Sequence, residues 1–350
     1  SGQPQGSLNP WESFYQDEKL VEFLRHYSTD FYEDEDVELI IDGDFYDLLA
    51  VRVDGKFPER ITERIALEKL RACIAGHAAV HQALKDFVRT PRKRVTIMPG
   101  NHDWDLVFPR VQDALREAIA GSRVDGRVQF ICDRERYEFD GVEIHHGMQF
   151  EAVNYHDFRE PILRPKRGEP ILNIPWGSIF ILKVITRFKA QRPYVDRVRP
   201  FSAFLIRSFI YDPIFAIKLL LLTLFFFLKT RVFALRGFGA RMRQTFRLIR
   251  DSDPYPDLIH KVRGLFEVHP HVHTIIMGHT HVPMVRRIAP DQLYINTGCW
   301  TGTVFLDIEN FGKESKLTYA LLEYAEDAAR PTASLREWRG YQEISREIHF

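Results

Sequence analysis

Four short apolar runs of the sequence each end beside a glycine and a side chain that can bind a metal ion. These side chains are Asp44, Asn101, His146, His279 and His281. Their mixture of oxygen and nitrogen donors suits manganese, iron or zinc better than calcium. Because open α/β sheets place their active sites at the carboxyl ends of strands, the pattern predicts a metal site there.

The same residues allow two metal ions. Two ions about 3.5 to 4 Å apart need a bridging carboxylate, and Asp44 is the natural candidate. Gly43 and Gly100 precede Asp44 and Asn101, and a residue without a Cβ lets the backbone turn sharply and approach closely. We therefore expect two divalent ions, of manganese, iron or zinc.

The elements that must position these residues alternate between helices and strands. Helical spacing of apolar residues covers 11–27 and 61–88, and short β-rich runs lie between and after them. This alternation predicts an α/β fold. The expected strands are 37–41, 94–98, 128–132, 137–139, 142–145, 274–277, 293–296, 303–308 and 317–322.

A basic and apolar segment interrupts the α/β pattern. Residues 159–250 hold 19 Lys/Arg against 4 Asp/Glu, although the whole chain balances 48 against 48. We expect a core over 1–147, an insertion or cap over 148–273, and a second part of the core with a tail over 274–350.

The centre of the insertion, 201–228, is apolar but is broken by Arg207, Asp212 and Lys218. A bilayer span requires about 20 apolar residues with few charges. We expect a helix that lies on an anionic membrane surface, and the alternatives are a buried cap helix or a dimer interface. The run is too apolar for a nucleic-acid groove.

The four motifs, in their order, resemble the calcineurin-like metallophosphoesterase family. The resemblance covers about 11–147 and 274–324 and implies an αββα sandwich with a dinuclear metal site. It implies that Asp44 bridges the two ions, that Asn101, His146 and His279 complete one site, and that His281 serves the other. In-line hydrolysis at phosphorus follows from such a site.

The resemblance also implies roles for residues near these ligands. His102 contacts the substrate phosphate or protonates the leaving oxygen, and Asp103 orients its ring. Asp47 holds the loop or a ligand in place.

One family motif is absent from the sequence. The family's first motif, Asp-x-His, supplies two ligands to the ion that His281 serves, and it occurs nowhere in the 350 residues. We expect it just upstream of Ser1. The alternative is a non-catalytic, membrane-docked scaffold with a degenerate metallophosphoesterase fold.

The expected activity is hydrolysis of a phosphoester or pyrophosphate. The basic, apolar insertion favours an amphiphilic, lipid-linked substrate, as in the UDP-2,3-diacylglucosamine pyrophosphatase branch of the family, which this chain partly resembles. A soluble nucleotide or phosphoprotein is the alternative. Three widely spaced cysteines match neither a disulfide framework nor a zinc site. The cysteines favour the reducing cytoplasm. The basic, apolar insertion favours a peripheral position on the inner face of the membrane.

Overall fold

The computed structural model contains the whole chain of 350 residues. The structure describes residues 11–189, 192, 195, 198–199, 201–231, 258–305, 312–314, 316–341 and 345–347.

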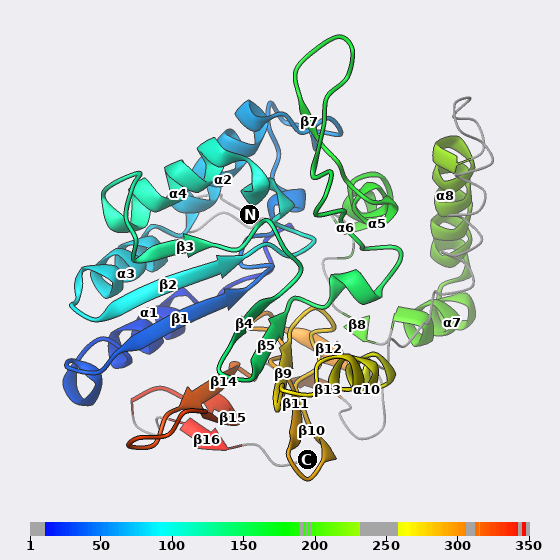
Figure 1. Cartoon of the computed structure of the whole chain (residues 1–350). Helices are drawn as coiled ribbons and strands as arrows, with labels where there is room; N and C mark the ends of the chain where they lie inside the picture. The colour runs from blue at the N-terminus through cyan, green and yellow to red at the C-terminus, as the bar shows by residue number, and fades with distance from the viewer. Residues whose placement is uncertain are drawn as a thin grey trace.

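The fold is mixed α/β, as the sequence predicts (Figure 1). One sheet has the parallel order β1-β2-β3, and a larger mixed sheet has the order β10-β11-β9-β5-β4. Smaller sheets are β14-β15-β16, β13-β12-β8 and β6-β7. The strands are β1 (Val37–Asp42), β2 (Lys93–Met98), β3 (Val128–Phe130), β4 (Tyr137–Phe139), β5 (Val142–His145), β6 (Ile162–Leu163), β7 (Ile171–Leu172), β8 (Val198–Arg199), β9 (Thr274–Met277), β10 (Met284–Ala289), β11 (Gln292–Asn296), β12 (Thr303–Phe305), β13 (Gly312–Glu314), β14 (Thr318–Glu323), β15 (Thr332–Trp338) and β16 (Ser345–Glu347).

Helices cover one face of the first sheet. Alternation along β2 sends Val95 and Ile97 to this face, where they pack with Leu84 and Phe87 of the third helix in one buried core. The helices that build this layer are α1 (Asp17–His26), α2 (Glu63–Gly76), α3 (Ala78–Arg89) and α4 (Pro109–Ala120).

The other face of the first sheet packs on the second sheet. Met98 of β2 lies in one buried cluster with Ile144 of β5 and Ile276 of β9. The preceding residue of β9, Ile275, points to the opposite face and packs against Val262 of α10 (Ile259–Val268). The packing order is therefore helices, sheet, sheet and helix.

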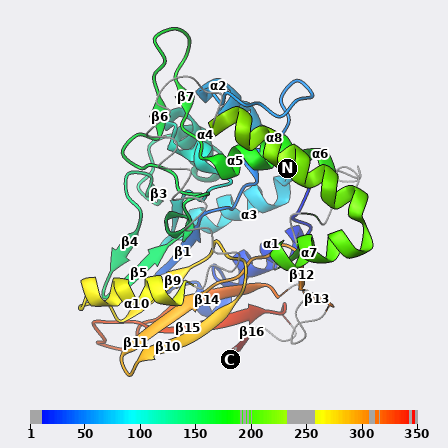
Figure 2. The same ribbon diagram turned by 90° about the vertical axis from the view of Figure 1, so that its right-hand side faces the viewer.

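The described part of the insertion is mainly helical. It contains α5 (Trp176–Phe180), a π-helical turn η5 (Ile181–Ile185), α6 (Thr186–Lys189), α7 (Phe201–Tyr211) and α8 (Pro213–Arg231). Figure 1 shows α8 set apart from the sheets, and Figure 2 looks onto its outer side. None of the helices in the described ranges has both the length and the apolarity needed to cross a bilayer.

Two long helical runs of the sequence are each divided. The run 61–88 forms α2 and α3 with a break at His77, and 201–228 forms α7 and α8 with a break at Asp212. Pro213 explains the second break, because proline disfavours the α conformation in the preceding residue and lacks an N–H. The helix expected over 11–27 begins at Asp17. Of the strand expected over 303–308, residues 306–308 lie outside the described residues.

Candidate metal centre

The four motifs meet at one edge of the paired sheets. Strands β1 and β2 run parallel with Asp42 beside Met98, and β5 and β9 run parallel with His145 beside Met277. In each parallel pair, the loops that follow the two strands therefore begin side by side at the carboxyl edge of the sheet. Across the second pair, the Gly278 amide donates to the His146 carbonyl at 3.2 Å.

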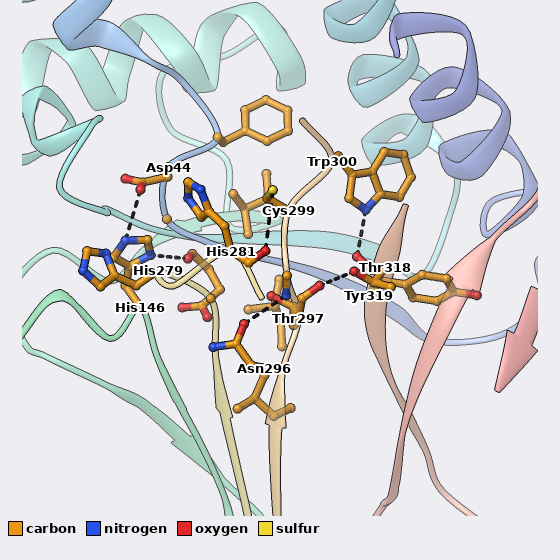
Figure 3. Close-up of a pocket in the computed structure, with 18 of the residues that line it drawn as sticks. Asp44, His146, His279, His281, Asn296, Thr297, Cys299, Trp300, Thr318 and Tyr319 are labelled. Carbon is orange, nitrogen blue, oxygen red and sulfur yellow. Dashed lines mark hydrogen bonds and ion pairs between the residues drawn. The ribbon is translucent and has the colours of Figure 1, made fainter. Parts of the chain in front are cut away.

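Three of the predicted ligands form a compact cluster. One ligand atom each from Asp44, His146 and His279 lies within 4.8 Å of the other two, so the group could hold a metal ion. Figure 3 shows the three side chains together on one wall of a cavity. Two of them follow the second sheet and one follows the first.

The His146 ring is oriented so that its Nε2 faces two oxygens. Its Nδ1 donates to the Asp42 carbonyl at 2.7 Å, while Nε2 lies 3.2 Å from Asn101 Oδ1 and 3.3 Å from Asp44 Oδ2. A neutral imidazole that donates from Nδ1 has a lone pair at Nε2. Three electron-rich atoms therefore converge, and a cation stabilises such an arrangement.

The electrostatics of this group also favour positive charge. Burial by itself lowers the pKa of His146, but the carboxylates of Asp44 and Asp42 outweigh it and raise the pKa to about 9. Burial likewise opposes ionisation of Asp44, yet His146 and His102 hold the pKa of that carboxyl well below its usual range. The pocket thus favours a positive charge between its carboxylates, and a metal ion bound there would take the place of the His146 proton.

His279 has the orientation of a metal ligand supported by a second residue. Its Nε2 donates to Glu151 Oε2 at 2.9 Å, and its Nδ1 is buried without a hydrogen-bond partner among the described residues. Metal-binding histidines commonly donate their other ring N–H to a carboxylate. Glu151 was not predicted from the sequence, because it lies outside the four motifs.

The glycines in the first two motifs make room for the ligands. Gly43 has φ +76°, and a Cβ there would lie 2.5 Å from His146 Nδ1. A Cβ on Gly100 would lie 2.5 Å from the Asp44 amide nitrogen and would also overlap the Asp44 carboxylate. Any larger residue would therefore displace the ligands.

Asp42 is a second acidic group at this edge, and it is not among the predicted ligands. Both its carboxylate oxygens are buried and have no hydrogen-bond partner in the part of the chain that the structure describes. Burial raises the pKa of this carboxyl well above its usual range. Asp42 lies two residues before Asp44 at the end of the same predicted strand, and this spacing is the sequence signal for a second carboxylate at the site.

Asp47 lies at the His102 ring, the position expected for Asp103. Asp103 holds the loops together, the role expected for Asp47. Asp47 Oδ1 lies 3.0 Å from His102 Nδ1, so Asp47 orients the ring. The Asp103 carboxylate turns inward and accepts from the backbone N–H groups of Gly100, Asp44 and Tyr46 at 2.6, 3.2 and 3.3 Å. It therefore joins the loop that carries Asp44 to the loop that carries Asn101.

His281 lies apart from the cluster. It lines the same cavity, but it is not among the three side chains that come within ligand distance of one another. In Figure 3 it lies between that group and Cys299. The described residues thus bring together four of the five predicted ligands, counting Asn101.

The cavity of about 2740 Å³ extends far beyond the cluster. Every residue of β1 lines it, as does all of 318–324 around β14. Because alternate side chains of a strand point to opposite faces, a cavity lined by consecutive residues runs along the strand's edge. Among the strands that the structure describes, β1 pairs with β2 alone.

A scan against known protein families finds no match to the chain, and a search of curated proteins finds no relative. Its function is therefore inferred from the site.

Proposed function

We propose that the protein is a metal-dependent phosphoester or pyrophosphate hydrolase of the metallophosphoesterase type. The observation that carries the proposal is the convergence of His146 Nε2, Asn101 Oδ1 and the Asp44 carboxylate, with the buried Nδ1 of His279 beside them. Carboxylate, amide and imidazole ligands at the ends of parallel strands fit a transition-metal ion.

The packing of the chain supports the same assignment. Helices lie on the outer face of the first sheet, α10 lies on the outer face of the second, and Met98 and Ile276 pack between the sheets. From this order we infer an αββα sandwich, in which the ends of β1, β2, β5 and β9 would lie around the cluster.

We propose that Asp44, Asn101, His146 and His279 hold one divalent ion of manganese, iron or zinc. Such an ion supplies Lewis acidity toward a phosphoryl oxygen and neutralises charge that develops there. A second ion would use the other side of Asp44 together with His281. That site requires more ligands than the described residues bring together.

His102 is the candidate acid for the leaving oxygen. It lines the cavity with a side chain that is 26% exposed, and its own backbone N–H donates to Asp44 Oδ1 at 2.8 Å. The hydrogen bond to Asp47 fixes the ring. The imidazole is therefore held beside the candidate ligands in the wall of the cavity, where it can protonate a leaving group.

Hydrolysis of p-nitrophenyl phosphate and bis(p-nitrophenyl) phosphate tests the proposal. The protein is stripped with chelator and reloaded with manganese, zinc or iron, and we expect hydrolysis only after reloading. Substituting Asn101→Ala or His146→Gln should abolish it, while His271→Gln, at an exposed histidine outside the cluster, should not. Metal-independent hydrolysis would contradict the proposal.

One observation favours a second candidate function, a non-catalytic membrane-docked scaffold. His281 lies outside the cluster, so the described residues assemble one metal site. A folded, metal-loaded protein that hydrolyses neither ester would support the scaffold.

A further inference from the structure

Among the described residues, the α7–α8 hairpin (201–231) packs on the body through one side of α8. Phe215, Leu219 and Phe226 of α8 are buried in one cluster with Val184 and Ile185 of η5. The Asp212 carboxylate accepts from the Phe215 amide at 3.2 Å and so caps α8. These contacts fix which side of the hairpin faces outward.

The outward side is also apolar. Ile214 and Leu221, seven residues apart on α8, are 68% and 59% exposed. A surface helix normally presents polar residues opposite its buried stripe, whereas α8 is apolar on both sides. The exposed large apolar residues of the hairpin are Ile206, Phe209, Ile210, Tyr211, Ile214, Ile217, Leu220, Leu221, Leu224, Phe225 and Leu228.

The charges that border this face are positive. Arg207 and Lys218 are exposed, and Asp212, the one acidic residue of the hairpin's sequence, pairs with Arg192. The sequence that follows α8 is basic as well and has no acidic residue through position 250. Lys229 and Arg231 belong to the last turn of α8, and the sequence after it contains Arg236, Arg241, Arg243, Arg247 and Arg250.

An apolar helical face on which the cations of Arg207 and Lys218 are exposed, followed by a basic sequence, fits the surface of an anionic bilayer. Amphipathic segments that lie in the membrane interface combine buried apolar side chains with Lys and Arg, which meet anionic head groups. Protein interfaces usually have polar rims of mixed character. No described helix is suited to cross the bilayer, so the hairpin would lie along it.

We propose that the α7–α8 hairpin docks the protein on anionic lipid membranes. The opposite side of the hairpin packs on η5, and Ile181 and Ile185 of η5 line the large cavity. The docked face is thus separated from the metal cavity by one helical layer. A substrate with lipid tails would meet the cavity close to the membrane.

Vesicle co-sedimentation tests the proposal with the full chain. Vesicles of phosphatidylcholine alone are compared with vesicles that contain phosphatidylserine or phosphatidylglycerol. We expect binding to the anionic vesicles, weakened by salt, and at least tenfold weaker binding of the Ile214→Glu/Leu221→Glu variant. The matched control is Val124→Glu/Val268→Glu, which adds the same charges at two exposed apolar residues of the body and should bind like the parent.

Failure to bind anionic vesicles, or equal binding by both double variants, would overturn the proposal. So would a dimer that Ile214→Glu/Leu221→Glu dissociates, if the parent does not bind vesicles, because a second copy would then cover the face. The binding measurement uses no phosphoester, so its outcome is independent of hydrolysis.

Discussion

Asp47 Oδ1 lies 3.0 Å from His102 Nδ1, across two loops that follow neighbouring strands. Burial opposes ionisation of Asp47, but the His102 ring outweighs it and lowers the pKa of the carboxyl. The ionised carboxylate sets the tautomer and direction of the imidazole. Asp47 is thus a positioning residue for His102.

Substitution of Asp47→Asn should lower kcat without removing the metal. Loss of a partner that orients a catalytic or ligand histidine costs about 10- to 100-fold, and we expect a fall of that size. Elemental analysis of the same sample should show unchanged metal content. Asp36→Asn, at an exposed carboxylate, is the control. A kcat equal to that of the parent would remove Asp47 from the site.

Substitution of Asp103→Ala should destabilise the fold. It leaves the buried N–H groups of Gly100, Asp44 and Tyr46 without their acceptor, and we expect a loss of about 3 kcal/mol. Urea denaturation measures it. Asp103→Asn keeps one acceptor oxygen and should lose less; equal stability of all three proteins would contradict the assigned role.

Metal binding should raise thermal stability. Asp42, Asp44 and His146 are buried together, and a ligand that binds only the folded state adds about 2.7 kcal/mol at 100 times its Kd. Differential scanning calorimetry of stripped and manganese-loaded protein should show a higher Tm for the loaded form. The shift should vanish in His146→Gln and persist in His271→Gln. A metal-induced shift that survives His146→Gln would place the ion elsewhere.

The contribution of His77 to stability should depend on pH. Hydrogen bonds to Asp17 and Glu12 raise the pKa of His77 to about 9 from its usual 6.5. Because the folded pKa is raised, the stabilisation is fully present below pH 6.5 and disappears as the pH rises through 9.

Replacing His77→Gln should therefore destabilise the fold more at pH 6 than at pH 10. We expect a difference of about 1 kcal/mol, since the pair is partly exposed and screened by solvent. Urea denaturation at both pH values measures it. In an Asp17→Asn background the difference should shrink, and an equal loss at both pH values would disprove the ion pair.

The sequence predicted the strands and the ligands that follow them because both depend on local patterns. Buried runs such as 274–277 are short and bounded by glycine, and their ends carry the ligand side chains. Parallel pairing then brings the ends together. This is why the sequence alone singles out Asp44, Asn101, His146 and His279 as candidate ligands, of which Asp44, His146 and His279 form a group that could hold a metal ion.

Other features depend on contacts between distant segments. Asp47 and Asp103 differ from their predicted positions because the Asp103 carboxylate turns inward. There it accepts hydrogen bonds from backbone N–H groups of the loops that follow β1 and β2. Glu151 contacts His279 across 128 positions. The break at His77 is stabilised by carboxylates of the N-terminal segment. Helix α10 packs on the second sheet although it lies within the insertion expected over 148–273.

Metal stoichiometry is the most direct test of the central claim, that Asp44, Asn101, His146 and His279 form a metal centre. Protein purified without chelator is analysed for its elements, beside His146→Gln and the control His271→Gln. We predict at least one manganese, iron or zinc ion per chain in the parent and the control, and loss of that ion in His146→Gln. A folded parent without bound transition metal, or an equal content in His146→Gln, would contradict the account.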